Sequence, residues 1–226
     1  MKHSTAEVRW VFMANFPTDV LPSDIKIGSH YQTTESTTQS YRRRVATRGG
    51  HRWSFELSYN PQKQSAFSKI FAFIHSLKGR FGSCTFDLPN YSTQSNFTMK
   101  SGITDITVST TVSNGTEISL AGIDTGSQIK AGDFFSIQGS TKKYMVTQDV
   151  TTTSTHSAGN DNAGATPIYF CPALIQQADA GNTITFNQEF QVSLAEDEFY
   201  VNFPMEKTFS TSIKLIETTT STGSTY

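Results

Sequence analysis

The fold is decided by residues 51–82, which read HRWSFELSYNPQKQSAFSKIFAFIHSLKGRFG. Large apolar side chains alternate with polar ones from Trp53 to Tyr59. A period of two is typical of a strand that buries one of its faces. Asn60 and Pro61 follow, and these residue types favour the N-cap and first position of a helix. The sequence therefore predicts a strand that passes directly into a helix.

The next residues have the spacing of an amphipathic helix. Apolar residues recur every three or four positions and form one face: Phe67, Ile70, Phe71, Ile74 and Leu77. Gly79 is the expected stop, because glycine readily takes the conformation that ends helices. Alternation resumes at Cys84, Phe86 and Leu88 and predicts a second strand. We expect one helix, at about residues 61–78.

Strand patterns return near the C-terminus. Apolar residues alternate over 190–194, three acidic residues at 196–198 predict a turn, and alternation resumes over 199–203. A last strand is predicted over 209–215, followed by a polar tail. Nearer the N-terminus, residues 8–12 alternate like a strand.

Between these parts, residues 91–185 have a different character. Their predicted strands are short and threonine-rich, are separated by Gly, Asn, Asp and Ser turns, and lie at 103–108, 116–120, 134–137, 143–147 and 168–170. Five short strands suit a small barrel of the OB type. We therefore expect an all-β protein with one helix and two domains. Residues 1–90 and 186–226 form one domain, and 91–185 form an inserted barrel. Residues 31–40 are expected to be a polar loop or arm, and 151–166 a low-complexity loop.

The composition supports this class and excludes several others. Aromatic residues make up 12% of the chain, which is more than disordered chains carry. A net charge of −1 excludes a generic nucleic-acid-binding surface. No apolar run is long enough for a membrane helix, and the first ten residues lack the apolar segment of a secretory signal. Cys84 and Cys171 are expected to be buried thiols rather than a disulfide.

The chain carries no common catalytic motif: G-x-S-x-G, a Walker loop, G-x-G-x-x-G and H-E-x-x-H are all absent. Its histidines are scattered. Glu196, Asp197 and Glu198 could hold a cation or form an acid–base pair, but adjacent carboxylates in a turn point apart into water, which favours a solvated turn. A hydrolase would need such groups opposed in a pocket. We therefore expect no enzyme activity, no catalytic residues, and no metal or organic cofactor.

One basic cluster stands out, at Arg42, Arg43 and Arg44. It fits a solvated loop, a contact with an acidic protein surface, or a contact with passing nucleic acid. A basic loop and the acidic turn at 196–198 could complement each other between copies of a nearly neutral chain. Our candidate assembly contacts are therefore Arg42, Arg43 and Arg44, together with Tyr200 and Phe203 of the predicted strand that follows the acidic turn.

Several short motifs follow one another along the chain, and their order is informative. RWSFEL at 52–57 leads to a helix that ends in LKGRFG at 77–82, and FDLP follows at 86–89. The insert then carries IKAGDFFSI at 129–137 and KYMVT at 143–147. With these motifs the chain resembles the distal tail proteins (Dit) of siphophages, in particular the type that infects Gram-negative hosts. The resemblance covers about Arg52 to Glu217, and the first 50 residues carry almost none of it.

This resemblance implies a tail-tube-like β-sandwich with an inserted, outward-facing OB-fold. It implies a structural virion protein at the phage tail tip or baseplate, made in the host cytoplasm and not inserted in a membrane. Copies would form a homo-hexameric ring that joins the tail tube protein to the baseplate hub protein, near the tape measure protein or side fibres. Viral DNA would pass through the ring without sequence-specific binding. No catalytic residues are implied.

The alternative function is a carbohydrate-binding tail module that contacts the host surface. OB barrels bind oligosaccharides, so the inserted barrel could do so. An exposed pair of stacked aromatic rings on that barrel would favour this alternative.

Overall fold

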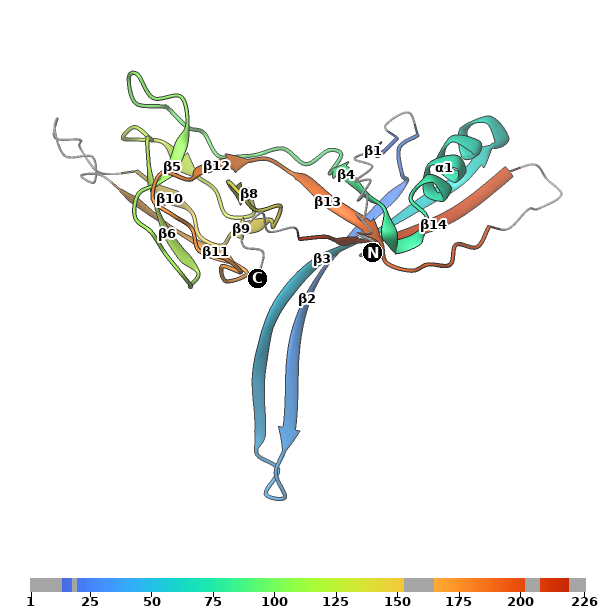
Figure 1. Cartoon of the computed structure of the whole chain (residues 1–226), viewed down its shortest axis with the longest axis horizontal. Coiled ribbons are helices and arrows are strands. Elements are labelled where there is room, and N and C mark those ends of the chain that lie inside the picture. The colour runs from blue at the N-terminus through green and yellow to red at the C-terminus, as the bar shows by residue number, and fades with distance from the viewer. Residues whose placement is uncertain (1–13, 18–19, 153–164, 202–207, 220–226) are drawn as a thin grey trace, which may run out of the picture. The chain divides into compact units, whose positions relative to one another are not determined.

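The computed structural model describes residues 14–17, 20–152, 165–201 and 208–219 (Figure 1). Within these residues the protein is mostly β with one α-helix and contains a closed six-stranded barrel, which confirms the predicted fold class. Contacts divide the chain into two units. The sheet unit comprises residues 1–30, 52–86 and 191–218, and the barrel unit comprises 31–51, 87–190 and 219–226. The predicted strand at 8–12 lies outside the described residues.

A six-stranded sheet has the strand order β1-β4-β13-β14-β3-β2. Its strands are β1 (Ala14–Asn15), β2 (Asp24–Thr37), β3 (Arg43–Lys63), β4 (Ser83–Asp87), β13 (Glu189–Leu194) and β14 (Thr208–Glu217). β14 runs antiparallel to both β13 and β3, and β1 runs parallel to β4. The strands predicted from alternation at 53–59, 190–194 and 209–215 lie within these elements, and the one predicted at 84–88 matches β4 except for Leu88, which lies beyond its end.

The α-helix α1 (Gln64–Ser76) packs its predicted apolar face into the core of the sheet unit. It buries Phe67, Ile70 and Ile74. The ring of Phe67 stacks on that of Phe209 from β14, with centroids 5.0 Å apart. Burial of such side chains contributes about 1.5–3 kcal/mol each, so the apolar stripe accounts for most of the stability of the helix.

The predicted start of the helix at Pro61 is wrong. β3 continues to Lys63, and Gln62 pairs with Phe209 of β14. Lys63 is the N-cap and makes no side-chain capping bond. Pairing with the neighbouring strand satisfies the backbone where a local cap was expected, so the tertiary context overrides the capping signal.

The predicted strand at 199–203 is also wrong where the structure describes it. Residues 199–201 have no regular secondary structure, and Phe203 lies outside the described residues. The ring of Phe199 lies 6.3 Å from that of Phe71 on α1. The alternation of apolar residues therefore reflects packing against the helix rather than pairing in a sheet.

The barrel closes in the order β11-β6-β5-β12-β8-β9. Its strands are β5 (Ile106–Val108), β6 (Glu117–Ala121), β8 (Phe134–Ile137), β9 (Tyr144–Val146), β11 (Thr166–Cys171) and β12 (Thr183–Phe186). A further pair joins β7 (Gln128–Ile129) to β10 (Val150–Thr151). Strand β12, absent from the prediction, closes the barrel between β5 and β8. Phe135 fills the interior, with its ring within 5.6 Å of those of Tyr144 and Phe170.

Candidate assembly surface

The most exposed regular structure is a two-stranded ribbon, residues 29–50, made by the facing parts of β2 and β3 (Figure 1). Its turn is held by two backbone bonds: the N–H of Thr38 donates to the carbonyl of Arg42, and the N–H of Tyr41 donates to the carbonyl of Thr38. Residues 31–37 are thus a paired strand. The sequence predicted a polar loop or an arm over residues 31–40. A loop is wrong for residues 31–37, and an arm fits.

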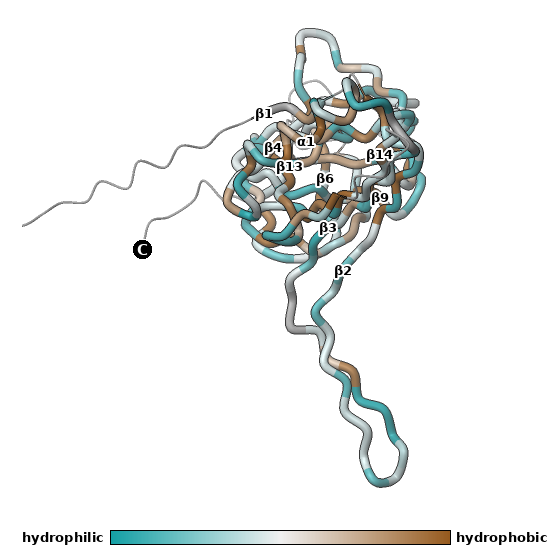
Figure 2. The backbone as a smooth tube through the Cα atoms, turned by 90° about the vertical axis from the view of Figure 1, so that its right-hand side faces the viewer, coloured by the Kyte–Doolittle hydropathy of each residue, from teal (hydrophilic) through white to brown (hydrophobic). Residues whose placement is uncertain are grey.

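The side chains of the ribbon are almost all exposed. Every residue from Ser29 to Thr37 and from Tyr41 to Thr47 is exposed. The described pairing of β3 with β14 begins only at Ser54, so the ribbon pairs with itself. Figure 2 shows mainly hydrophilic and pale colours along it, with one short hydrophobic stretch. Because an isolated two-stranded hairpin is marginally stable in water, a ribbon of this length gains stability when another surface covers it.

The ribbon carries the side chains typical of a contact surface. Tyr41 is 91% exposed, and Tyr31 and Val45 are about half exposed. The predicted assembly residues Arg42, Arg43 and Arg44 are all exposed at its tip, residues 38–44. Arg43 Nε lies 2.7 Å from Glu35 Oε1 across the ribbon. Tyr and Arg are the residue types enriched at binding hot spots.

No protein-family model matches the chain, and no curated protein is detectably similar to it. The resemblance to the distal tail proteins therefore rests on the motifs quoted above, and it stays a prediction.

The acidic turn belongs to the sheet unit, and its three carboxylates diverge. Asp197 accepts the backbone N–H of Arg80 at 3.0 Å, Glu196 lies 3.5 Å from Lys214 Nζ, and Glu198 accepts the hydroxyl of Tyr200. That hydrogen bond, with a smaller contribution from desolvation, raises the pKa of Tyr200. The carboxylates thus face three different partners, so the turn offers no opposed acid–base pair.

Tyr200, the other described candidate, is 80% exposed beside this turn. It shares a groove of about 500 Å³ with the acidic residues. The groove is lined by Ser58 and Tyr59 of β3, residues 210–214 of β14, and Leu194, Glu196, Glu198, Phe199 and Tyr200. The structure therefore places Tyr200 with the acidic turn in the sheet unit. The three arginines belong to the barrel unit.

Two residues that line this groove carry fully buried hydroxyls that have no hydrogen-bond partner among the described residues. They are Tyr59 and Thr211, which face each other across β3 and β14. Tyr59 is only 3% exposed, and burial raises the pKa of its phenol well above the ordinary value. Buried polar groups are nearly always bonded, so two unsatisfied hydroxyls in one groove need an explanation. Alternation in the sequence marks Tyr59 only as a core residue and carries no signal for this role.

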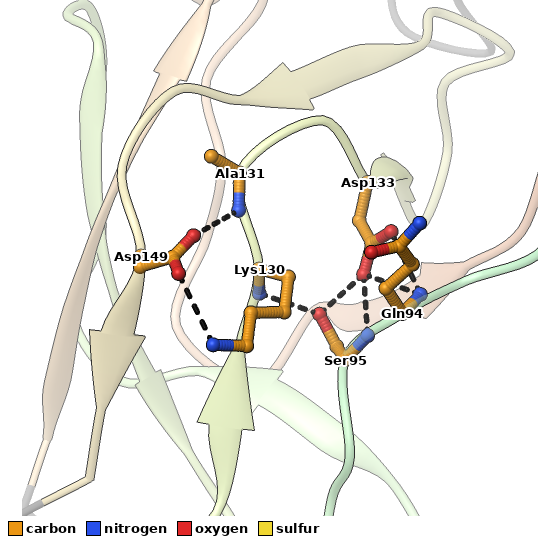
Figure 3. Close-up of polar contacts among 6 residues, drawn as sticks. All are labelled: Gln94, Ser95, Lys130, Ala131, Asp133 and Asp149. Atoms are coloured by element: carbon orange, nitrogen blue, oxygen red, sulfur yellow. Dashed lines mark hydrogen bonds and ion pairs between the residues drawn. The ribbon is translucent and has the colours of Figure 1, made fainter.

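The GD motif at 132–133, by contrast, has a structural role (Figure 3). Asp133 is buried and accepts the backbone N–H groups of Gln94 and Ser95, at 2.9 and 2.7 Å, and the hydroxyl of Ser95. The same hydroxyl accepts the N–H of Lys130 at 2.9 Å. Gly132 has φ +99, which favours glycine, and accepts the hydroxyl of Tyr91. The motif therefore fastens the segment around residues 91–95 to the barrel.

Asp149 holds the same loop from its other side (Figure 3). It accepts the N–H of Ala131 at 2.8 Å and the ammonium of Lys130 at 3.1 Å. These two bonds lower the pKa of Asp149, the backbone bond most. Nowhere in the described residues do three His, Cys, Asp or Glu side chains lie together in a way that could hold a metal ion. No described helix is long and apolar enough to cross a membrane.

Proposed function

We propose that this chain is a structural subunit of a phage tail that assembles with copies of itself into an adaptor ring. The observation that carries the proposal is the exposed ribbon. Ordering a strand pair costs about 1–2 kcal/mol of backbone entropy per residue, and the ribbon buries almost none of its own side chains in return. Contact with another subunit would supply that missing burial.

A closed ring is the natural form of such a contact. A ribbon that reaches from one copy to the next makes a head-to-tail interface, and such interfaces close into rings when the rotation between copies allows it. Six copies, the place between tail tube and tip hub, and passage of viral DNA are what the resemblance adds. The absence of an opposed acid–base pair in the acidic turn agrees with a structural rather than catalytic role.

Light scattering combined with electron microscopy of the purified full chain tests this function. We expect concentration-dependent formation of closed six-fold rings. Reversing the charge of Arg43 and Arg44 to Glu should weaken assembly, more so at low salt where charges are less screened. The matched control is Lys63→Glu, which reverses an exposed cation at the start of α1. A wild-type chain that stays monomeric at high concentration and on purified tail tubes would refute the proposal.

A second candidate function, saccharide binding, is favoured by a groove on the barrel. Its volume is about 350 Å³, and it lies between residues 93–99 and strands β5 and β12. The rings of Phe97 and Phe186 line it, with centroids 4.7 Å apart and planes tilted by 48°. Both rings are half-buried, so they fit the expected exposed stack only in part. Titration with host-surface polysaccharide, compared between wild type and Phe97→Ala, tests this candidate.

A further inference from the structure

We infer that the groove beside the acidic turn is the seat for the ribbon tip of a second copy of this chain. In this arrangement Tyr41 of one copy enters the groove of the next, and Arg42 and Arg44 lie against Glu198 and Glu196. The inference rests on the proposed self-assembly and names the two surfaces that meet. It assigns a role to the unsatisfied hydroxyls of the groove, which the ring proposal alone leaves unexplained.

The residues that line the groove favour a polar occupant. Tyr59 and Thr211 line the groove, and their hydroxyls are fully buried with no partner among the described residues. Each hydroxyl can both donate and accept a hydrogen bond. Burying such groups unsatisfied is unfavourable, so an occupant whose docking shifts these side chains enough to bond their hydroxyls recovers that loss. A volume of about 500 Å³ is in the range of ordinary ligand pockets. It can hold an aromatic side chain that carries a hydroxyl.

The ribbon tip carries such a side chain. Tyr41 is 91% exposed and has φ 58, in the left-handed region. Bulky residues seldom occupy that region, and glycine or asparagine would be the usual choice in a tight turn. A tyrosine held there presents its ring and hydroxyl to a partner at some conformational cost. Backbone outliers of this kind cluster at binding sites.

Complementary charges orient the ribbon tip of one copy relative to the groove of the next. The rim of the groove carries two carboxylates, of which Glu196 lies 3.5 Å from Lys214 Nζ and Glu198 accepts the hydroxyl of Tyr200. The tip carries Arg42 and Arg44 on either side of the paired Arg43. Opposite charges on two surfaces of a nearly neutral chain favour association between copies and fix their register. Phe199 and Tyr200 add aromatic surface beside the rim on which arginine side chains can stack.

The proposed occupant is the ribbon tip of a second copy. One chain carries both parts, with Arg43 at the tip and Tyr59 among the residues that line the groove. Each copy therefore has one surface of each kind to offer to its neighbours in the proposed ring.

Photo-crosslinking of the full chain tests the seat directly. Benzoylphenylalanine replaces Tyr41, and equal amounts of ¹⁴N- and ¹⁵N-labelled protein are mixed before assembly and irradiation. We expect mixed-isotope crosslinks from position 41 to peptides that contain Tyr59 or residues 194–200 and 208–214. Rings that form with crosslinks to other peptides would overturn the seat and leave the assembly proposal standing. Failure of the wild-type chain to assemble at all would overturn both.

A charge swap gives a second, independent readout by sedimentation. We expect a tip variant (Arg42→Glu with Arg44→Glu) and a groove variant (Glu196→Lys with Glu198→Lys) each to associate about 10-fold more weakly than wild type. An equimolar mixture should recover wild-type association to within about threefold, because alternating copies restore every pair. A mixture that associates no more tightly than its components would refute the pairing.

Tyr59→Phe tests the hydroxyl contact. It should weaken association about threefold or more without lowering the melting temperature of the unassembled chain. An unchanged association would count against the hydroxyl contact.

Discussion

Replacing Asp133 with Ala should destabilise the barrel strongly. The carboxylate is 1% exposed and accepts two backbone N–H groups and one hydroxyl from Gln94 and Ser95. Hydrogen bonds to a charged group contribute about 1.5–3 kcal/mol each, and their removal leaves three donors without an acceptor. Because such contributions are not additive, we expect a loss of about 3–5 kcal/mol in the free energy of unfolding. Asp133→Asn keeps one acceptor oxygen but turns an amide donor toward other donors, so it should lose about 1–3 kcal/mol.

Urea unfolding followed by hydrogen exchange in barrel peptides measures this loss. With a slope of about 2 kcal/mol per M, the midpoint of the barrel should fall by about 2 M in the Ala variant. Trp53 belongs to the sheet unit and serves as an internal reference for that unit. The control is Asp105→Ala, an exposed carboxylate of the same barrel, with an expected change below about 0.5 kcal/mol. A change below about 1 kcal/mol for Asp133→Ala, or unaltered exchange around residues 94–95, would refute the anchoring role.

Three further predictions concern other parts of the chain. Cys84 is buried as predicted, but Cys171 is partly exposed, so the prediction of a buried thiol is wrong there. Burial raises the pKa of the Cys84 thiol to about 12. At pH 8 a thiol reagent should therefore label Cys171 in the native chain and Cys84 only after unfolding, as mass spectrometry can show. The pKa of Asp149 is lowered in the folded state. The stability that this carboxylate contributes is therefore present above its ordinary pKa of 3.8 and is lost as the pH falls through the folded pKa. Asp149→Asn should flatten that part of the acid-unfolding curve. Replacing residues 92–184 with a short Gly/Ser linker should leave a cooperatively melting remainder, and a remainder that aggregates would contradict the predicted limits of the inserted domain.

Patterns of burial made most of the fold predictable. The alternation from Trp53 to Tyr59 and the stripe along α1 reflect burial within the sheet unit, and the structure places both as expected. The errors occur where two physical causes give the same pattern. Phe199 is apolar because it packs near Phe71 on the helix, and its spacing imitates a strand. Pro61 has the residue type of a helix start, yet the pairing of β3 with β14 continues past it.

The two surfaces of the proposed seat escaped prediction for a different reason. Residues 31–37 have no alternation of polar and apolar side chains, because all seven residues are exposed. Tyr59 and Thr211 have ordinary strand positions, and only the three-dimensional structure shows that their hydroxyls lack a hydrogen-bond partner in the described part of the chain. Sequence reasoning could find Arg42, Arg43 and Arg44 because charge clustering needs no partner to be visible.

A surface that is completed by a second copy should look polar, exposed and energetically incomplete in a single chain. The ribbon tip and the groove are each incomplete in a different way. The tip presents an exposed tyrosine and arginines with no burial, while the groove presents burial with unsatisfied hydroxyls and an acidic rim. An isolated defect of either kind could be neutral in evolution. Two defects whose charges and hydrogen-bonding needs match are better explained by one contact that resolves both.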